Sequence, residues 1–212
     1  MKFKIADIPG ESLKLNDVIP LNYCRFISEF AKPQLLTSSF IDIMYHERYM
    51  KGCTLRNIVF YVKKPVTLLT SVSKTRGVID CMLSGNIEFQ LNGQERISFN
   101  EGEYSVYLMN TDMHTIYLQP GTYELQRCEY SMEIIKRLEE ETSQTQHWLD
   151  KYESGTSAFF NKGLIWDELD ALQKELKHTP VISPLREELF YLRLRELLVL
   201  TFEHETLVIQ NQ

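Results

Sequence analysis

The stretch from Gly77 to Tyr130 is divided by turn-forming residues, and this punctuation constrains the fold more than any other feature of the chain. Runs of apolar or alternating residues are separated by Gly, Asn, Asp and Pro about every eight to ten positions. Short strands at such intervals are typical of a β-sandwich or a β-barrel. We therefore expect this stretch to form a barrel, and we look for function in what the barrel encloses and carries.

The dipeptide Asn92-Gly93 lies within this stretch and predicts a hairpin. Its residue types suit the two positive-φ positions of a tight turn, so the runs on either side are expected to pair antiparallel. In the first run Ile87, Phe89 and Leu91 share one face, and polar residues share the other. This alternation predicts one buried face and one face in water.

The residues before the barrel stretch add further strands. Alternation over residues 35–49 predicts one strand, and β-branched and aromatic residues predict two more at 56–62 and 66–72. Together with the barrel stretch this makes about eight or nine strands. Residues 1–34 show weak patterns interrupted by proline and are expected to be irregular.

In the C-terminal part of the chain the hydrophobic period becomes that of a helix. Ile134, Ile135 and Leu138 predict a first amphipathic helix, which fades in the polar stretch 142–146. Residues 152–162 are expected to form a loop. A second helix is predicted from a narrow apolar stripe made of Ile165, Leu169, Leu172 and Leu176.

A third helix is predicted to begin at Ser183-Pro184, because Ser is a good N-cap and Pro suits the first helical position. Its residues 189–202 are apolar on nearly every side, so the helix must bury two sides. One side is expected to pack on the barrel or on a neighbouring helix, and the other on a second copy of the chain. Leu194 and Leu198, one turn apart, are predicted at the centre of that dimer contact.

The chain of 212 residues has a net charge of −6, and the negative excess lies after residue 130. Nucleic-acid binding needs clustered Lys and Arg, and neither half offers a cluster, so the chain is not expected to bind DNA by itself. Four scattered cysteines predict free thiols. The sequence shows no signal-peptide core and no run of membrane-spanning length, which predicts a cytoplasmic protein without a membrane partner.

Four polar or amphipathic residues fall on successive predicted barrel strands: Tyr107, His114, Tyr117 and Arg127. Inside an otherwise apolar barrel such side chains would orient a small ligand, so we predict them as ligand-binding residues. A shift of strand phase by one residue would turn half of them outward, and this alternative stays open.

A wider set of residues carries a resemblance to a known protein family. It consists of Gly77 to Leu91 with Asn92-Gly93, then Phe99, Gly102, Tyr104, His114, Gly121 and Tyr123, and the helical stretch 191–198. Through them the chain resembles the N-terminal sensor and dimerisation domain of AraC-type transcription regulators. The resemblance implies a mainly β fold with C-terminal helices. A cupin-like (double-stranded β-helix) barrel at residues 1–130 would be followed by a helical dimerisation arm at residues 131–212.

The resemblance also implies how such a protein works. A small-molecule effector, with sugars as one candidate class, would bind in the barrel and bias the helical arm. The arm would form a homodimer, and DNA would be bound only through two helix-turn-helix units that follow this helix in the family. The chain ends at Gln212 without them, so we expect either an excised sensor domain or a natural protein without a DNA-binding half.

Metal and catalytic chemistry are not expected. Cupins that bind metal carry a His-x-His pair and a later His, whereas the five histidines here are single and only His114 falls near the later position. Cys81 and Cys128 are interpreted as small buried apolar side chains. Motifs for nucleophilic catalysis and for phosphate or dinucleotide binding are missing from the sequence. We therefore predict no metal, no cofactor and no enzymatic activity.

Three alternative functions stay open. The chain could be a stand-alone cupin-type small-molecule binding protein, or a metal-independent enzyme similar to a sugar isomerase. Such an enzyme needs an acid and a base inside the barrel, and His114 is the candidate, with a carboxylate partner not located in the sequence. The chain could also be a dimerisation module whose barrel is filled by side chains.

Overall fold

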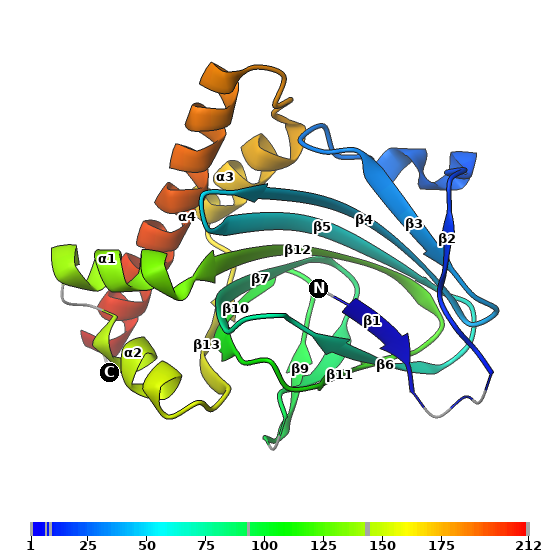
Figure 1. The fold of residues 1–212 in the computed structure, drawn as a ribbon, viewed down its shortest axis with the longest axis horizontal. Coiled ribbons are helices and arrows are strands. Elements are labelled where there is room, and N and C mark those ends of the chain that lie inside the picture. The colour runs from blue at the N-terminus through cyan, green and yellow to red at the C-terminus, as the bar shows by residue number, and fades with distance from the viewer. Residues whose placement is uncertain (1, 7, 9, 93, 143–144, 211–212) are drawn as a thin grey trace.

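Two antiparallel sheets face each other in the computed structural model, and helices cover the outer face of the larger sheet (Figure 1). The structure describes residues 2–6, 8, 10–92, 94–142 and 145–210. Within them, the smaller sheet has the strand order β1 (Lys2–Ile5), β6 (Val66–Ser71), β11 (His114–Leu118), β8 (Ile87–Gln90) and β9 (Arg96–Phe99). The larger sheet has the order β13 (Ala158–Leu164), β10 (Glu103–Met109), β7 (Arg76–Ser84), β12 (Gly121–Ser131), β5 (Cys53–Val62), β4 (Ile41–Met50), β3 (Pro33–Thr37) and β2 (Lys14–Asn16).

Strands β5 to β12 form the barrel, and their order identifies its topology. Counted from β5 as the first, the larger sheet joins the first, eighth, third and sixth strands, and the smaller sheet joins the second, seventh, fourth and fifth. This is the order of a jelly roll, the double-sheet arrangement of cupin barrels. The predicted fold class, mainly β with C-terminal helices and a cupin-like barrel, is confirmed.

The larger sheet is buried on both faces because it lies between the smaller sheet and the helices. In β5, Ile58 and Phe60 face the barrel interior, whereas Leu55 and Val59 point to the other face, and all four are fully buried. Successive side chains of a strand point to opposite faces, so a strand covered on both sides reads as a nearly continuous apolar run. The protein therefore has one core inside the barrel and a second core under the helices.

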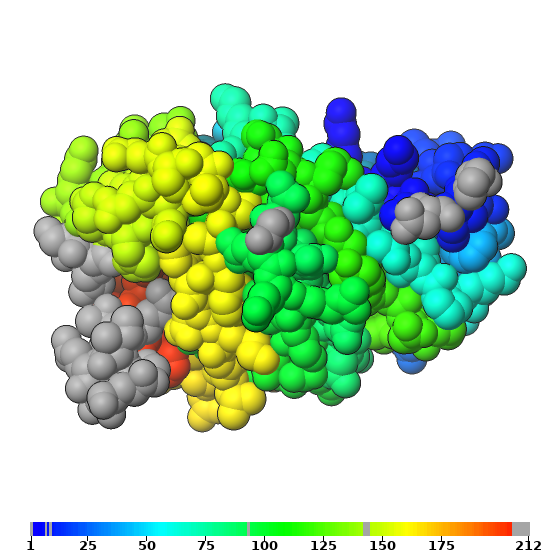
Figure 2. All heavy atoms as spheres, turned by 90° about the horizontal axis from the view of Figure 1, so that it is seen from below, coloured from blue at the N-terminus to red at the C-terminus, as the bar shows by residue number. Residues whose placement is uncertain are grey.

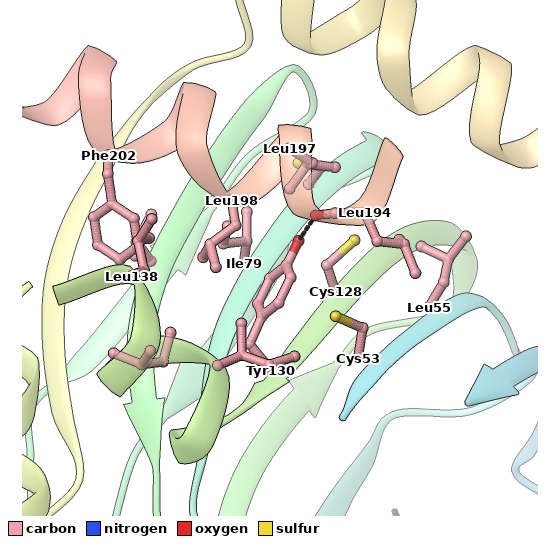
Figure 3. Packing of buried hydrophobic residues seen from close by; sticks show 14 of the residues in the cluster. Cys53, Leu55, Ile79, Cys128, Tyr130, Leu138, Leu194, Leu197, Leu198 and Phe202 are labelled. Atoms are coloured by element: carbon pink, nitrogen blue, oxygen red, sulfur yellow. Dashed lines mark hydrogen bonds between the residues drawn. The ribbon is translucent and has the colours of Figure 1, made fainter. Parts of the chain in front are cut away.

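The described helices are a 3₁₀ helix at Leu21–Phe26, α1 (Met132–Thr142), α2 (Gln146–Glu153), α3 (Asp167–His178) and α4 (Pro184–Gln210). Figure 3 shows the core under the helices, where α4 crosses the strands. The Tyr130 hydroxyl donates a 2.8 Å hydrogen bond to the Leu194 carbonyl, which ties the end of β12 to α4. Among the described residues, no helix is both long and apolar enough to span a membrane.

Two predictions for the N-terminal third were wrong in detail. Residues 35–49, predicted as one strand, contain the turn between β3 and β4. The Ser38 hydroxyl accepts hydrogen bonds from the backbone N–H groups of Phe40 and Ile41, at 3.2 and 3.1 Å, and so stabilises this turn. Residues 1–34, predicted as irregular, contain β1 and β2, which pair at the edges of the two sheets.

Residues 152–162, predicted as a loop, form the end of α2 and most of β13. β13 pairs antiparallel with β10, from Leu164 opposite Glu103 to Ala158 opposite Leu108. The strand is thus created by a partner distant in sequence, which local propensity does not reveal. In Figure 2 this segment, coloured yellow, lies beside green atoms of the barrel residues.

The predicted hairpin is confirmed, because β8 and β9 pair antiparallel with Ile87 opposite Phe99. Its turn residue Gly93 lies outside the described residues. The prediction of free thiols is also confirmed, since all four cysteines are unpaired. Burial raises the pKa of Cys53 to about 12, so this thiol is not a reactive one.

The N-cap predicted for α4 is confirmed, because Ser183 Oγ accepts a 3.3 Å hydrogen bond from the Arg186 N–H. The predicted orientation of the helix is corrected. Leu194 and Leu198 are 0% and 2% exposed and pack on the protein's own sheet, so they are not on a free surface. The exposed apolar side chains of this region, called the exposed stripe below, are Ile182, Leu185, Leu189 and Leu192.

Candidate functional site

Five ionisable side chains form a charged row: Glu47, Arg56, Glu129, Arg127 and Asp80. The last four are buried on barrel strands, whereas Glu47 extends the row from β4 and its side chain is 38% exposed. In the strand register, Glu47 is paired with Arg56, Arg56 with Arg127, and Arg127 with Asp80, across β4, β5, β12 and β7. Directly paired residues of an antiparallel sheet point to the same face. Glu129 follows Arg127 by two positions on β12 and therefore shares that face.

The inner end of the charged row is a closed hydrogen-bonded cluster. Arg127 donates from Nε to Asp80 Oδ1 and from Nη2 to Asp80 Oδ2, both at 2.7 Å. The Tyr107 hydroxyl donates to Asp80 Oδ2 at 2.6 Å and accepts from Arg127 Nη2 at 2.7 Å. All three residues are at most 3% exposed. Burial raises the pKa of Tyr107 well above its usual value, so the phenol keeps the proton that it donates.

The outer end of the charged row is centred on Arg56. Its guanidinium forms ion pairs with Glu47 and with Glu129, and its side chain is 7% exposed. Burial would raise the pKa of Glu129, but the charges of Arg56 and Arg127 outweigh it, and the net shift is downward. Glu129 is therefore a carboxylate held between two guanidinium groups.

The charged row is costly to bury. Buried ion pairs lose the hydration of both partners, and replacing them with apolar side chains is often neutral or stabilising. Clusters of buried ionised groups beside a cavity are, by contrast, frequent at functional sites. The row is thus the strongest candidate for a site in the described residues.

Two cavities adjoin the charged row. The first, between the sheets, has a volume of only about 10 Å³ and is lined in part by Asp80, Ser105 and Arg127. That volume is enough for about one water molecule. The second, called the mouth pocket below, has a volume of about 200 Å³. It lies at the outer end of the row and is lined by Glu47, Tyr49, Thr54, Arg56, Val72, Ser73, Arg76 and Glu129.

Two of the four predicted ligand-binding residues come together in the barrel. Tyr107 and Arg127 belong to the hydrogen-bonded cluster with Asp80. The cavity beside Arg127 has a volume of only about 10 Å³, so the polar partners of these two side chains are other protein side chains. Their role in binding a ligand stays a prediction. The structure places the larger cavity next to Arg56 and Glu129, at the other end of the charged row.

The other two predicted residues lie elsewhere. His114 is buried, and its ring holds a loop, because Nδ1 accepts from the Asn92 N–H at 3.1 Å and Nε2 lies 3.2 Å from the Asn110 carbonyl. Tyr117 is only partly buried, with its hydroxyl donating to Gln90 at 2.8 Å. The Arg96 guanidinium stacks 3.7 Å from its ring centroid. Tyr117 therefore faces away from the charged row.

Sequence reasoning missed Glu47, Arg56, Asp80 and Glu129. The signal was present in the strand phase, because Arg56 alternates with Ile58 and Phe60 and so shares their buried face. A charged residue in phase with core residues marks a buried charge, which needs a partner. For metal chemistry the described residues offer no group of three His, Cys, Asp or Glu side chains, and the absence of a metal stays a prediction.

A second polar row lies on the opposite face of the same strands, under the helices. It contains His46, Asn57 and Gln126, which are paired with one another across β4, β5 and β12. His46 Nε2 accepts from the Ser28 N–H at 3.1 Å, and Gln126 donates to the Gln173 carbonyl of α3 at 3.3 Å. Glu124 of β12 lies on the same face, where it accepts from Asn57 at 3.0 Å and forms an ion pair with Lys177 of α3. Strand β12 thus carries Arg127 and Glu129 towards the barrel, and Gln126 and Glu124 towards the helices.

Comparisons with known proteins give structural likenesses only. No protein-family model matches the sequence, and no curated protein matches it. The solved AraC-like transcriptional activator CuxR matches 91% of this chain at 8% identity and a TM-score of 0.49. The chain spans 60% of the activator's length.

Other similar structures cover a smaller share of the chain. A cupin superfamily protein from Desulfitobacterium hafniense DCB-2 matches 42% of this chain and 76% of its own, at 8% identity and a TM-score of 0.34. An HTH_3 family transcriptional regulator from Vibrio cholerae matches 42% of this chain and 51% of its own, at 12% identity and a TM-score of 0.34.

Proposed function

We propose that this chain is the effector-sensing and dimerising domain of an AraC-type transcription regulator, in which another domain binds DNA. The observation that carries the proposal is the alternation of side chains along β12. Arg127 and Glu129 point to the charged row, whereas Gln126 and Tyr130 point outward and hold α3 and α4. A ligand that shifts the charged side chains therefore acts on the strand that seats the helices.

The second part of the proposal is that the chain dimerises through α4. The contact would use the exposed stripe and not the face with Leu194 and Leu198 that the sequence predicted. Three residues of the exposed stripe, Leu185, Leu189 and Leu192, recur at intervals of four and three positions, so they lie along one side of α4. Ile182 lies just before the helix. Packing the stripe against a second copy would bury eight apolar side chains and yield on the order of 10 kcal/mol. The cost of association is of similar size, about 4–15 kcal/mol, so a symmetric contact is energetically reasonable.

The enzyme alternative has less support. An isomerase-like reaction needs an acid and a base whose pKa values lie near the working pH. The pKa of Glu129 is lowered by its arginine partners, which makes this carboxylate a poor acid at neutral pH. Both carboxylate oxygens of Asp80 are engaged, by Arg127 and by the Tyr107 hydroxyl, so they are not free to contact a substrate. His114 is engaged with the loop and lies outside the charged row.

The remaining alternatives differ in what the barrel holds. The nearly filled interior favours a dimerisation module that binds nothing, whereas the mouth pocket favours a sensor or a stand-alone small-molecule binding protein. A thermal-unfolding screen with sugars, amino acids, organic acids and nucleotides separates them. We expect one class to raise the unfolding temperature and to change the dimer dissociation constant measured by light scattering. Stabilisation without any change in dimerisation would favour the stand-alone binding protein, and no stabilisation by any class would favour the module.

A further inference from the structure

The mouth pocket has two walls of opposite character. One wall is made by the outer end of the charged row, where Arg56 is shared by Glu47 and Glu129. The other wall comes from the turn between β6 and β7, with Val72 and Ser73, and from Arg76 at the start of β7. The pocket of about 200 Å³ lies between them, and it is more than large enough for several atoms of a ligand.

The charges of the two walls do not balance within each wall. On the first wall, the carboxylates of Glu47 and Glu129 both pair with Arg56. Arg127 also acts on Glu129 but is itself paired with Asp80, so the charged row keeps one negative charge in excess. On the second wall, Arg76 forms no close ion pair with any residue that the structure describes. The Glu133 carboxylate interacts with the charges of both Lys74 and Arg76, so these three residues together leave one positive charge in excess. The whole pocket is therefore neutral but strongly dipolar, with its negative side at Glu47 and Glu129 and its positive side at Arg76.

We propose that the mouth pocket binds a zwitterionic amino-carboxylic acid, with its carboxylate at Arg76 and its ammonium group at the Glu47 and Glu129 wall. This proposal names the effector class of the sensor and so rests on the proposed function. A guanidinium matches a carboxylate with two parallel hydrogen bonds, and an ammonium group donates well to carboxylates. The hydroxyls of Thr54 and Ser73 line the same pocket and supply further polar partners.

Other ligand classes fit the two walls less well. A neutral sugar would leave both excess charges without a charged partner, and partnerless charges in a partly buried site are costly. A dicarboxylate would satisfy Arg76 but would place its second charge near Glu47 and Glu129. A simple amine would satisfy the carboxylates and leave Arg76 unpaired. One positive and one negative group on a small ligand satisfy both walls.

The test is calorimetric titration of the whole chain with the natural amino acids, and with the matching amines and carboxylic acids that lack one of the two charged groups. We expect at least one amino acid to bind with a dissociation constant of about 1 mM or tighter. Its amine and carboxylic-acid analogues should bind at least about tenfold more weakly, because each loses a charge-assisted hydrogen bond.

Three variants locate the binding. Arg76→Gln should weaken binding of the amino acid at least about tenfold while leaving binding of the corresponding amine unchanged. Glu47→Gln should weaken binding of the amino acid and of the amine, and it should leave binding of the carboxylic acid unchanged. Lys74→Gln is the matched control, because it removes one positive charge from the same loop without lining the pocket, and it should leave all affinities unchanged.

The outcomes separate this proposal from the proposed function. Suppose that a sugar or another uncharged ligand binds, and that Arg76→Gln does not change its affinity. The proposal of a zwitterionic effector would then be wrong, whereas the proposed sensor function would stand. If amino acids bind equally well to the Arg76→Gln and Glu47→Gln variants, the mouth pocket is not their binding site. The absence of binding by amino acids and by every other class tested would overturn both the effector class and the sensor.

Discussion

Arg127 and Asp80 lie opposite each other on β12 and β7 and hold each other by two hydrogen bonds of 2.7 Å inside the barrel. Neither side chain is more than 4% exposed. The pair is the inner end of the charged row, whose outer end forms one wall of the mouth pocket. Its energetics therefore show whether the row is a structural necessity or a feature kept for binding.

Removing one member of this pair should destabilise the protein far more than removing both. Asp80→Leu leaves the Arg127 guanidinium buried without its carboxylate, and we expect a loss of about 3–5 kcal/mol in the free energy of unfolding. The double variant Asp80→Leu with Arg127→Met should recover most of that loss, because it removes both buried charges. Urea denaturation measures both values.

The exposed ion pair of Arg96 with Glu88 provides the control, since both side chains are 51% exposed. Arg96→Ala should cost no more than about 1 kcal/mol. If the double variant were as unstable as Asp80→Leu alone, the row would be essential to folding, and its assignment to ligand binding would lose its energetic basis.

Acid should destabilise the protein in a window set by His46. Burial, reinforced by the charge of Lys177, lowers the pKa of His46 from 6.5 to about 4. Between these values the unfolded chain binds a proton that the folded protein does not, so stability falls as the pH drops from about 6.5 to about 4. The loss should be about 2–3 kcal/mol, and no contribution is expected above pH 6.5.

The physical cause can be separated from other titrations by substitution. His46 Nε2 must be unprotonated to accept from the Ser28 N–H, and Lys177 and Glu124 lie near the same interface. In His46→Gln the loss of stability between about pH 6.5 and 4 should shrink by about 2 kcal/mol relative to the unmodified chain. The lowered pKa of buried His114 contributes with the same sign and remains in the variant. An unchanged pH profile would mean that His46 titrates normally in the folded protein.

Dimerisation should depend on the exposed stripe and not on the buried face of α4. Leu189→Glu with Leu192→Glu should yield a folded monomer with a nearly unchanged free energy of unfolding, because both side chains are at least 40% exposed. Leu194→Ala should instead destabilise the fold by about 2–5 kcal/mol. Light scattering and urea denaturation distinguish the two effects. If the unmodified chain is monomeric at tens of micromolar, the proposal that the exposed stripe forms a dimer contact is wrong.

Much of the barrel could be predicted because its signals are local. Turn residues and alternation indicated the hairpin of β8 and β9, and the change of period indicated the helices. β13 was missed because residues 158–164 become a strand only through pairing with β10. The face of α4 was assigned incorrectly because its residues are apolar nearly all round, so the sequence alone does not indicate that Leu194 faces inward and Leu189 outward.

The candidate site was harder to predict because it depends on register. Arg127 and Tyr107 were found as polar residues on barrel strands, but their common partner Asp80 lies on a strand that the sequence does not place beside them. Arg56 and Glu129 meet only because β5 and β12, first and last in the barrel, are neighbours in the jelly roll. Such pairings follow from topology rather than from local pattern.

The central claim is that β12 links the mouth pocket to the dimerising helix, and dimer dissociation with and without ligand tests it most directly. Analytical ultracentrifugation would measure the dimer dissociation constant alone and with a saturating amount of the amino acid that gives the largest thermal stabilisation. We predict a change of about fivefold or more, the usual lower range of coupling between two sites. The same dissociation constant with and without bound ligand would contradict the account.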